Sequence, residues 1–282
     1  MDSRRSRRFA LFVAAVVMPI ATQALAGGWV ARHGMTSQSY QQAFDSYGAQ
    51  GYRLVDIGAY SVDGEPRFAA VWWQESPTSP RAWVAHHALS AVQFQRKLDR
   101  YREQGYRLVD VSGYAHAGKA RYAAIWQQRG GSAQVARHGM TPARFRETVD
   151  DLAAQGFRLT NVSGFTVARQ VRFAAAWTRD GGTRWQVRHG LTGAQYQRTF
   201  DRMVRRGLRL ADVSVYRVNG RARYAAVWVE AGGMTWQARH GQTSTQHQSS
   251  FGQLAAEGYR LVNVSAAGLP GGARYASIWW KL

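Results

Sequence analysis

The sequence predicts an α+β fold in which five tandem β-α-β-β repeats form a closed, mostly antiparallel β ring or barrel with the helices outside. An open arc or solenoid is the alternative. Three observations lead to this class. A histidine recurs at intervals of 54, 51, 51 and 51 residues, a glycine follows each histidine after 18 residues, and a tryptophan follows each glycine after 21. The three sets are His33, His87, His138, His189 and His240; Gly51, Gly105, Gly156, Gly207 and Gly258; and Trp72, Trp126, Trp177, Trp228 and Trp279.

Residues 1–26 are predicted to be a signal peptide. Arginines at positions 4, 5, 7 and 8 precede an apolar run, and Ala24-Leu25-Ala26 is typical of a cleavage site. The protein is therefore expected to be secreted or periplasmic, and no later stretch is long and apolar enough to predict a membrane span. Residues 27–282 are expected to form a single repeat domain, with units at approximately 29–80, 81–131, 132–182, 183–233 and 234–282.

Composition narrows the class of partner. The chain has no cysteine, so disulfides cannot stabilise it, and a net charge of +20 leaves about +17 after the predicted leader is removed. Such a charge attracts anionic partners, with an affinity that falls as salt rises. We expect an extracellular glycan or protein, and the charge does not exclude nucleic acid. The alternative is that many arginines are structural and the excess only aids solubility.

Each repeat is expected to open with a short strand, such as Trp236 to His240, followed by a helix. Hydroxyl residues predict the helix N-caps, with glutamine three residues later in three repeats and Pro142 at the first helical position in another. The recurring glycine predicts each helix end. The N-cap residues are Thr36, Ser90, Thr141, Thr192 and Thr243, and the glutamines are Gln93, Gln195 and Gln246.

A β-hairpin is expected to complete each repeat. Asn219-Gly220 and Asp63-Gly64 predict two-residue turns, which place Val218 opposite Arg221. That register predicts one face with Val213, Val215, Tyr224, Ala226 and Trp228, and another with Leu208, Leu210, Asp212, Tyr216, Arg223 and Val227. Because both faces are largely apolar, both are expected to be covered. Hairpins are also expected to join successive repeats, and pairing of the last strand with the first would then close the sheet.

The order of motifs resembles the bacterial tandem repeat domain family over residues 29–280. The motifs are Trp-Val-Ala-Arg-His-Gly, Tyr-x-x-x-Phe, Gly-Tyr-Arg-Leu-Val-Asp-Val-Ser and Arg-Tyr-Ala-Ala-Ile-Trp. Similar repeats form the N-terminal region of fungal polyglycine hydrolases, whose separate catalytic domain resembles serine β-lactamases. The resemblance implies a β-rich, barrel-like, non-catalytic domain with a part in engaging substrate proteins. The Ser-x-x-Lys motif of that catalytic domain is absent, because no serine stands three residues before Lys97, Lys119 or Lys281.

Three sets of recurring side chains are candidate ligand-binding residues. The Arg-His-Gly histidines, His33, His138, His189 and His240, favour a structural role at a strand-to-helix junction over a nucleophile, because a nucleophile needs one site with distinct partners. Binding of a metal or an anion by such histidines is the other interpretation, although no metal site and no cofactor is predicted. The recurring tryptophans are expected in the core. Trp73 and Trp280 alternate to the opposite face and are the aromatic ligand candidates.

The arginine set can be interpreted in two ways. Arg53, Arg107, Arg158, Arg209 and Arg260 recur at one strand position, and Arg67, Arg121, Arg172, Arg223 and Arg274 at another. A structural role would stack arginines on tryptophan or tyrosine rings and pair them with Asp56, Asp110 and Asp212, which Asn161 and Asn263 replace in two repeats. A functional role would place the first set around one rim as a multivalent anion site.

These patterns predict a secreted, non-catalytic module that binds an extracellular polymer or protein through repeated Arg, His and aromatic surfaces. A structural element that acts by self-association is one alternative. An accessory domain that helps a secreted serine hydrolase engage its substrate is the second. No residue is predicted to be catalytic.

Overall fold

The computed structural model describes residues 28–74, 81–182 and 184–281. The predicted signal peptide and the proline-containing connection between the first two repeats lie outside the described residues. Within the described part no helix is long and apolar enough to cross a membrane.

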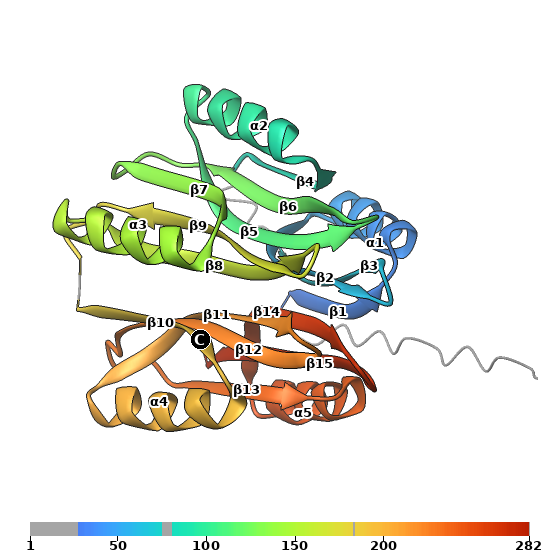
Figure 1. Cartoon of the computed structure of the whole chain (residues 1–282). Helices are drawn as coiled ribbons and strands as arrows, with labels where there is room; N and C mark the ends of the chain where they lie inside the picture. Colours follow the sequence, from blue (N-terminus) through green and yellow to red (C-terminus); the bar gives the residue numbers. More distant parts are fainter. Residues whose placement is uncertain (1–27, 75–80, 183, 282) are drawn as a thin grey trace, which may run out of the picture.

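Five copies of a strand, a helix and two further strands follow one another along the chain, as the repeat spacing predicts (Figure 1). The first repeat contains β1 (Trp29–Met35), α1 (Ser37–Ala49), β2 (Tyr52–Val62) and β3 (Glu65–Gln74). The second contains β4 (Trp83–Leu89), α2 (Ala91–Glu103), β5 (Tyr106–His116) and β6 (Lys119–Gln128), and the third β7 (Gln134–Met140), α3 (Pro142–Ala154), β8 (Arg158–Val167) and β9 (Gln170–Thr178). The fourth contains β10 (Trp185–Leu191), α4 (Gly193–Arg205), β11 (Leu208–Val218) and β12 (Arg221–Glu230), and the fifth β13 (Trp236–Gln242), α5 (Ser244–Ala256), β14 (Tyr259–Leu269) and β15 (Gly272–Lys281).

The helix ends confirm the capping predictions. Each predicted Thr or Ser is the N-cap and accepts a hydrogen bond from the backbone N–H three residues later. The full capping box forms in α2, α4 and α5, and Pro142 opens α3. The glycine after each helix has positive φ, for example +79° at Gly51, which ends the helix in a left-handed turn.

The predicted closed β ring or barrel is wrong. Strand pairing stays within each repeat and gives five separate three-stranded antiparallel sheets, in which the last strand of the repeat lies between the other two. The first strand of a repeat pairs with the last strand of the same repeat, as β4 does with β6, so hairpins do not join successive repeats. The short segment between repeats favours a hairpin between the last strand of one repeat and the first strand of the next. The last strand, however, already pairs on its two edges with the first and second strands of its own repeat.

The hairpin register confirms part of the predicted pattern and corrects another part. Val218 lies opposite Arg221, and Asn219 and Gly220 both have positive φ, as the predicted turn requires. A β-bulge between Leu210 and Asp212 then reverses the alternation. Leu208 and Leu210 therefore lie with Trp228 on the face covered by α4, not on the opposite face.

Each helix packs on one face of its own sheet and forms an aromatic core with it. In the third repeat Phe145 of α3 stacks on Phe173 of β9 with ring centroids 4.6 Å apart, and Trp177 is fully buried below them. The other four recurring tryptophans are also fully buried, which confirms their predicted core role. Truncation of such a buried aromatic residue to alanine typically lowers the free energy of unfolding by about 3–5 kcal/mol.

The sheets meet through their second strands. These strands contact one another from β2 through β5, β8, β11 and β14, and β14 contacts β2. The free edge of one second strand lies against side chains of the next: the N–H groups of Ile57 and Ala59 donate to Asp110 Oδ2 at 2.7 Å and Ser112 Oγ at 2.8 Å. Side chains thus satisfy edge groups that would otherwise remain unpaired or recruit another chain.

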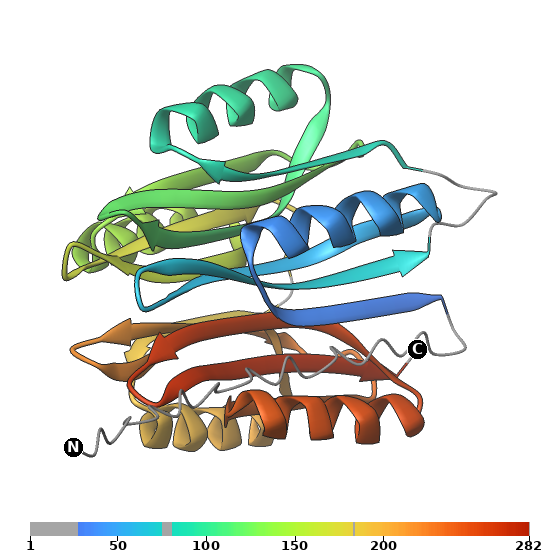
Figure 2. The same ribbon diagram turned by 90° about the vertical axis from the view of Figure 1, so that its right-hand side faces the viewer.

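The two ends of the second strands differ in what surrounds them. The hairpin turns lie on one side of the molecule, at the left in Figure 2, and the C-terminal end of β15 lies on the other. The starts of the second strands lie beside the ends of the last strands, where the chain leaves for the next repeat, as with Arg107 opposite Gln127. We call these two sides the hairpin end and the linker end.

Candidate functional site

The five arginines predicted to form a rim stand at the linker end. Arg53, Arg107, Arg158, Arg209 and Arg260 are each the first or second residue of a second strand, and each is half-buried. The bulge in each second strand places them on the face away from the helix, opposite residues such as Trp73 and Trp280.

Three of these arginines have different partners. Arg107 Nη2 donates to the carbonyl oxygen of Gly131 at 3.0 Å, and the guanidinium of Arg209 lies 5.1 Å from the ring centroid of Trp280. Arg158 forms an ion pair with Asp180. A carbonyl oxygen or an indole ring orients a guanidinium group without neutralising its charge, so Arg107 and Arg209 can still attract an anion.

Further arginines join this end from the segments between repeats. Partial burial, and then the nearby charges of Arg81, Arg53 and Arg107, lower the pKa of Arg129. Burial, and then the charge of Arg158, lower the pKa of Arg209. Like charges therefore lie close enough to repel one another. We call Arg53, Arg81, Arg107, Arg129, Arg158, Arg209 and Arg260 the linker-end arginines.

The predicted histidines lie at the junctions between repeats. Each imidazole meets the edge or face of two aromatic rings of the preceding repeat: His138 contacts Phe94 and Tyr122, with ring centroids 5.1 Å and 5.2 Å away. His189 and His240 do the same with the third and fourth repeats, and His33 with the fifth. Burial lowers the pKa of all four. This packing accounts for the histidine spacing without a ligand.

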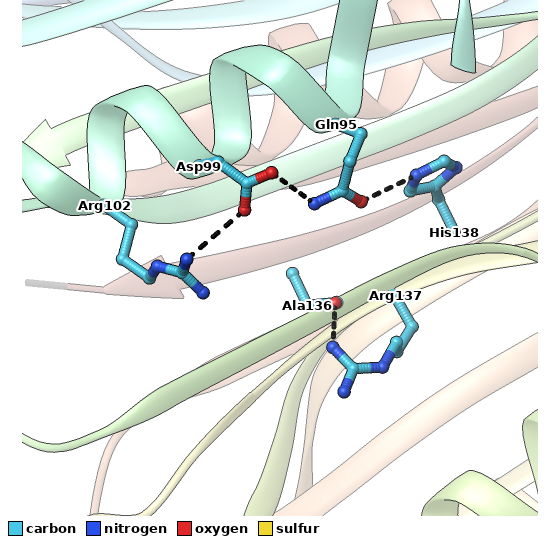
Figure 3. A network of polar contacts seen from close by, with 6 residues as sticks. All are labelled: Gln95, Asp99, Arg102, Ala136, Arg137 and His138. Atoms are coloured by element: carbon cyan, nitrogen blue, oxygen red, sulfur yellow. Dashed lines mark hydrogen bonds and ion pairs between the residues drawn. The ribbon is translucent and has the colours of Figure 1, made fainter. Parts of the chain in front are cut away.

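A polar relay orients the histidine at two junctions (Figure 3). His138 Nε2 lies 3.2 Å from Gln95 Oε1, Gln95 Nε2 donates to Asp99 at 3.0 Å, and Asp99 pairs with Arg102 at 3.4 Å. The fourth and fifth repeats reproduce the first two contacts with His240, Gln197 and Asp201. The relay in Figure 3 ends on an ion pair and not on a nucleophile, so its arrangement serves to hold repeats together. A groove of about 170 Å³ beside it lies between α2 and β7.

Trp73 and Trp280 are half-buried and so are only partly available to a ligand. Trp73 packs on the core shared by the fifth and first repeats, and Trp280 on the core shared by the fourth and fifth. The stacking of Arg209 on Trp280 links the predicted arginine and tryptophan sets in one surface.

In the described part of the chain, backbone N–H groups and asparagine amides are the partners of Asp56, Asp110 and Asp212, so the structure does not show the predicted pairing with arginines, whereas Arg209 does stack on Trp280. Asp56, Asp110 and Asp212 are buried with Asn161 and Asn263 between the five second strands, around a small space of about 20 Å³. We call these five residues the Asp/Asn cluster. Each aspartate accepts a hydrogen bond from a backbone N–H of the neighbouring repeat. Asn161 donates to Asp110 at 2.7 Å, and Asn263 donates to both Asp212 and Asp56.

Burial and mutual repulsion raise the pKa of these carboxyl groups. Burial, and then the charge of Asp212, raise the pKa of Asp110 to about 7, and burial raises that of Asp212 to about 7. Burial and the charge of Asp110 raise the pKa of Asp56 well above its usual range. In the described part of the chain, no group of three or more His, Asp or Glu residues has a geometry that could hold a metal ion.

Comparison with protein families supports the repeat architecture. The model for a family described as polyglycine hydrolase-like, structural repeat matches five segments, at residues 26–75, 80–129, 131–180, 182–231 and 233–281. These segments correspond closely to the repeats of the structure. No curated protein matches the chain.

Proposed function

Because the chain belongs to the family of polyglycine hydrolase-like structural repeats, we propose that it is a secreted, non-catalytic module that binds an anionic extracellular polymer. The linker-end arginines are the binding surface. The observation that carries the proposal is the recurrence of a half-buried arginine at the start of every second strand, which brings like charges together at one end of the molecule.

Repulsion within this set favours an anionic partner. Burial, and then the charges of Arg81, Arg53 and Arg107, lower the pKa of Arg129, and a polyanion that binds here reduces the repulsion among these guanidinium groups. Contacts with Gly131 and Trp280 hold Arg107 and Arg209 in place before binding, so less side-chain freedom is lost. Repetition adds effective concentration, because one polymer chain meets several arginines in succession.

Heparin, a sulfated polymer, is the anionic probe, and dextran is the uncharged control. We expect the protein to bind heparin and not dextran at about 50 mM salt, and the affinity to fall steeply by about 200 mM. The triple variant Arg81→Gln, Arg107→Gln, Arg129→Gln should bind heparin roughly tenfold more weakly or worse, with a shallower dependence of log K on log salt.

A matched variant separates a local site from the effect of net charge. Arg96→Gln, Arg146→Gln and Arg198→Gln together remove the same charge from exposed positions on α2, α3 and α4. This control should retain the affinity and the salt dependence of the wild-type protein. Equal weakening in both triple variants, or equal binding of dextran, would refute the proposed surface.

A further inference from the structure

A second site lies at the hairpin end, across the molecule from the linker-end arginines. A pocket of about 410 Å³ opens there, lined by residues from all five repeats near the ends of the second strands and by turn residues of three hairpins. Pockets for small organic ligands typically occupy about 300–1,000 Å³. We call this cavity the axial pocket.

Aromatic rings from four repeats line the axial pocket, and each of the three tyrosine hydroxyl groups among them has a hydrogen-bond partner within the protein. Tyr60, Tyr114, Phe165 and Tyr216 stand at equivalent positions of β2, β5, β8 and β11. Tyr60 OH lies 2.7 Å from Tyr275 OH, Tyr114 OH accepts from the N–H of Ala88 at 3.2 Å, and Tyr216 OH accepts from the N–H of Gly190 at 2.9 Å. The four rings are largely buried between repeats, and the part of each that lines the pocket is carbon. The fifth repeat carries Ala267 at this position, so the pocket has no aromatic ring on that side.

The mouth of the axial pocket is basic on one side. Arg169 and Arg217 line it, both are exposed, and neither forms an ion pair with another described residue. Thr166 Oγ1 donates to the carbonyl oxygen of Arg217, which fixes the backbone of Arg217 beside the strand that leads to Arg169. Asp63, the one acidic residue of the lining, belongs to the turn of the first repeat.

Arg169 occupies a position that favours glycine. Its φ is +62°, in the left-handed region, and the other four hairpins have Gly64, Gly118, Gly220 and Gly271 at the same place. A non-glycine residue there costs about 1–2 kcal/mol. Strain of this kind at the mouth of a pocket is a signal of function, and the arginine marks one repeat as different from the other four.

We propose that the axial pocket binds one small organic carboxylate, with its apolar body against the aromatic wall and its carboxylate between Arg169 and Arg217. Guanidinium groups bind carboxylates through paired hydrogen bonds, so two exposed arginines at one mouth select this group over a neutral one. Because the arginines stand on one side, the ligand binds in one orientation and with a stoichiometry of one. A free aromatic acid and the C-terminal end of a peptide present the same chemistry.

The probe is 1-naphthoate, followed by titration calorimetry, with the neutral 1-naphthamide as its isosteric partner. We expect one molecule of naphthoate per chain and at least tenfold weaker binding of the amide. The tripeptide Ala-Ala-Phe with a free or an amidated terminus shows which source the pocket prefers. Tighter binding of the free-terminus peptide assigns the pocket to a chain end, and tighter binding of naphthoate assigns it to a small acid.

The variant Arg169→Gly, Arg217→Gln should lose naphthoate binding by at least tenfold. Its thermal stability should not fall, because glycine is the residue of the other four turns and releases the strain at this position. Arg221→Gln, an exposed change in the same hairpin as Arg217, is the matched control and should bind as the wild type does. Full binding by the double variant, equal binding of the amide, or equal loss in the control would overturn the proposal. The Arg81, Arg107 and Arg129 triple variant should retain naphthoate binding, which keeps the two sites distinguishable.

Discussion

Asn263 of the fifth repeat donates a hydrogen bond to Asp56 of the first repeat at 3.1 Å, and the N–H of Val264 donates to the same carboxyl group at 2.8 Å. The two residues are 207 positions apart in the sequence. The junction between the fifth and first repeats therefore uses the same kind of hydrogen bond as the junctions between consecutive repeats, although none of the described strands pairs across either kind of junction.

Asp56→Asn should make stability less dependent on pH. Burial, and then the charge of Asp110, raise the pKa of the Asp56 carboxyl in the folded state, so its contribution to stability is present below about pH 4 and is lost as the pH rises through the raised pKa. The asparagine removes one of the three carboxyl groups of the Asp/Asn cluster, and Asn263 keeps its hydrogen bond to Asp212. Relative to wild type, the variant should gain free energy of unfolding as the pH rises from about 4 to about 8, measured in urea.

The buried histidines, whose pKa values are lowered, change the free energy of unfolding with pH in the opposite direction. Their contribution is the same in variant and wild type, so it cancels when the two proteins are compared. Asp63→Asn, in an exposed turn where Asn219 serves the fourth repeat, is the control and should show no such gain. A gain that is the same at every pH would contradict the role of the Asp56 charge.

Gly58→Ser should destabilise the protein even though the other four repeats carry serine at this position. A Cβ atom at Gly58 would lie 2.4 Å from the carbonyl oxygen of Val264, which is backbone and cannot move aside as a side chain can. We expect the free energy of unfolding to fall by about 1–3 kcal/mol in chemical denaturation. An unchanged or higher stability would show that the junction of the fifth and first repeats is looser than the structure indicates.

His247→Phe should raise stability in acid and have little effect near neutral pH. His247 occupies the helix position of Phe94 and Phe145, stacks on Tyr275 at 4.9 Å, and has its pKa lowered to about 3 by burial and then by His33. Its stability contribution is therefore present above about pH 6.5 and is lost as the pH falls. The variant should exceed wild type by about 1–2 kcal/mol at about pH 5, and by much less at about pH 8. Equal differences at both values would contradict this account.

Ala226→Ser should stabilise the fourth repeat. In the fifth repeat Trp279 Nε1 donates to Ser277 Oγ at 2.9 Å, whereas the indole N–H of Trp228 has no acceptor among the described residues and Ala226 stands where Ser277 does. We expect a gain of about 0.5–1 kcal/mol, and a loss of about 1 kcal/mol for Ser277→Ala, by thermal or urea unfolding. Ala225→Ser, on the other face of the same strand, should lower stability, and a gain there would contradict the role of the indole.

Local features could be predicted from the sequence because their causes lie within a few residues. Thr141, Pro142 and Gly156 bound α3 through the hydrogen bonds and dihedral angles of one turn each. The bulge after Leu210 could not be predicted, since no glycine or proline marks it and its register depends on the partner strand.

Some features of the functional surfaces could likewise be predicted from the sequence, and others could not. The start of each second strand could be found from the spacing, and Arg107 and Arg209 both lie there, at the linker end. The role of Asp110 could not be found, because its partner is a backbone N–H of Ile57, 53 residues earlier. Arg169 carries a visible signal, an arginine where four other turns have glycine, but only the positive φ and the pocket give that difference a meaning.

The Asp/Asn cluster has an odd number of members because the molecule has five repeats, and this number affects its hydrogen bonding. Asparagine amides alternate with aspartate carboxylates along most of the cluster, so that a donor faces an acceptor, as Asn161 faces Asp110 and Asn263 faces Asp212 and Asp56. Strict alternation needs an even number of members, and the molecule has five repeats. One neighbouring pair must therefore be alike, and that pair is Asp56 and Asp110. Burial, and then the charge of Asp110, raise the pKa of Asp56, so the like pair that an odd repeat number requires adds to the pH dependence that burial gives this cluster.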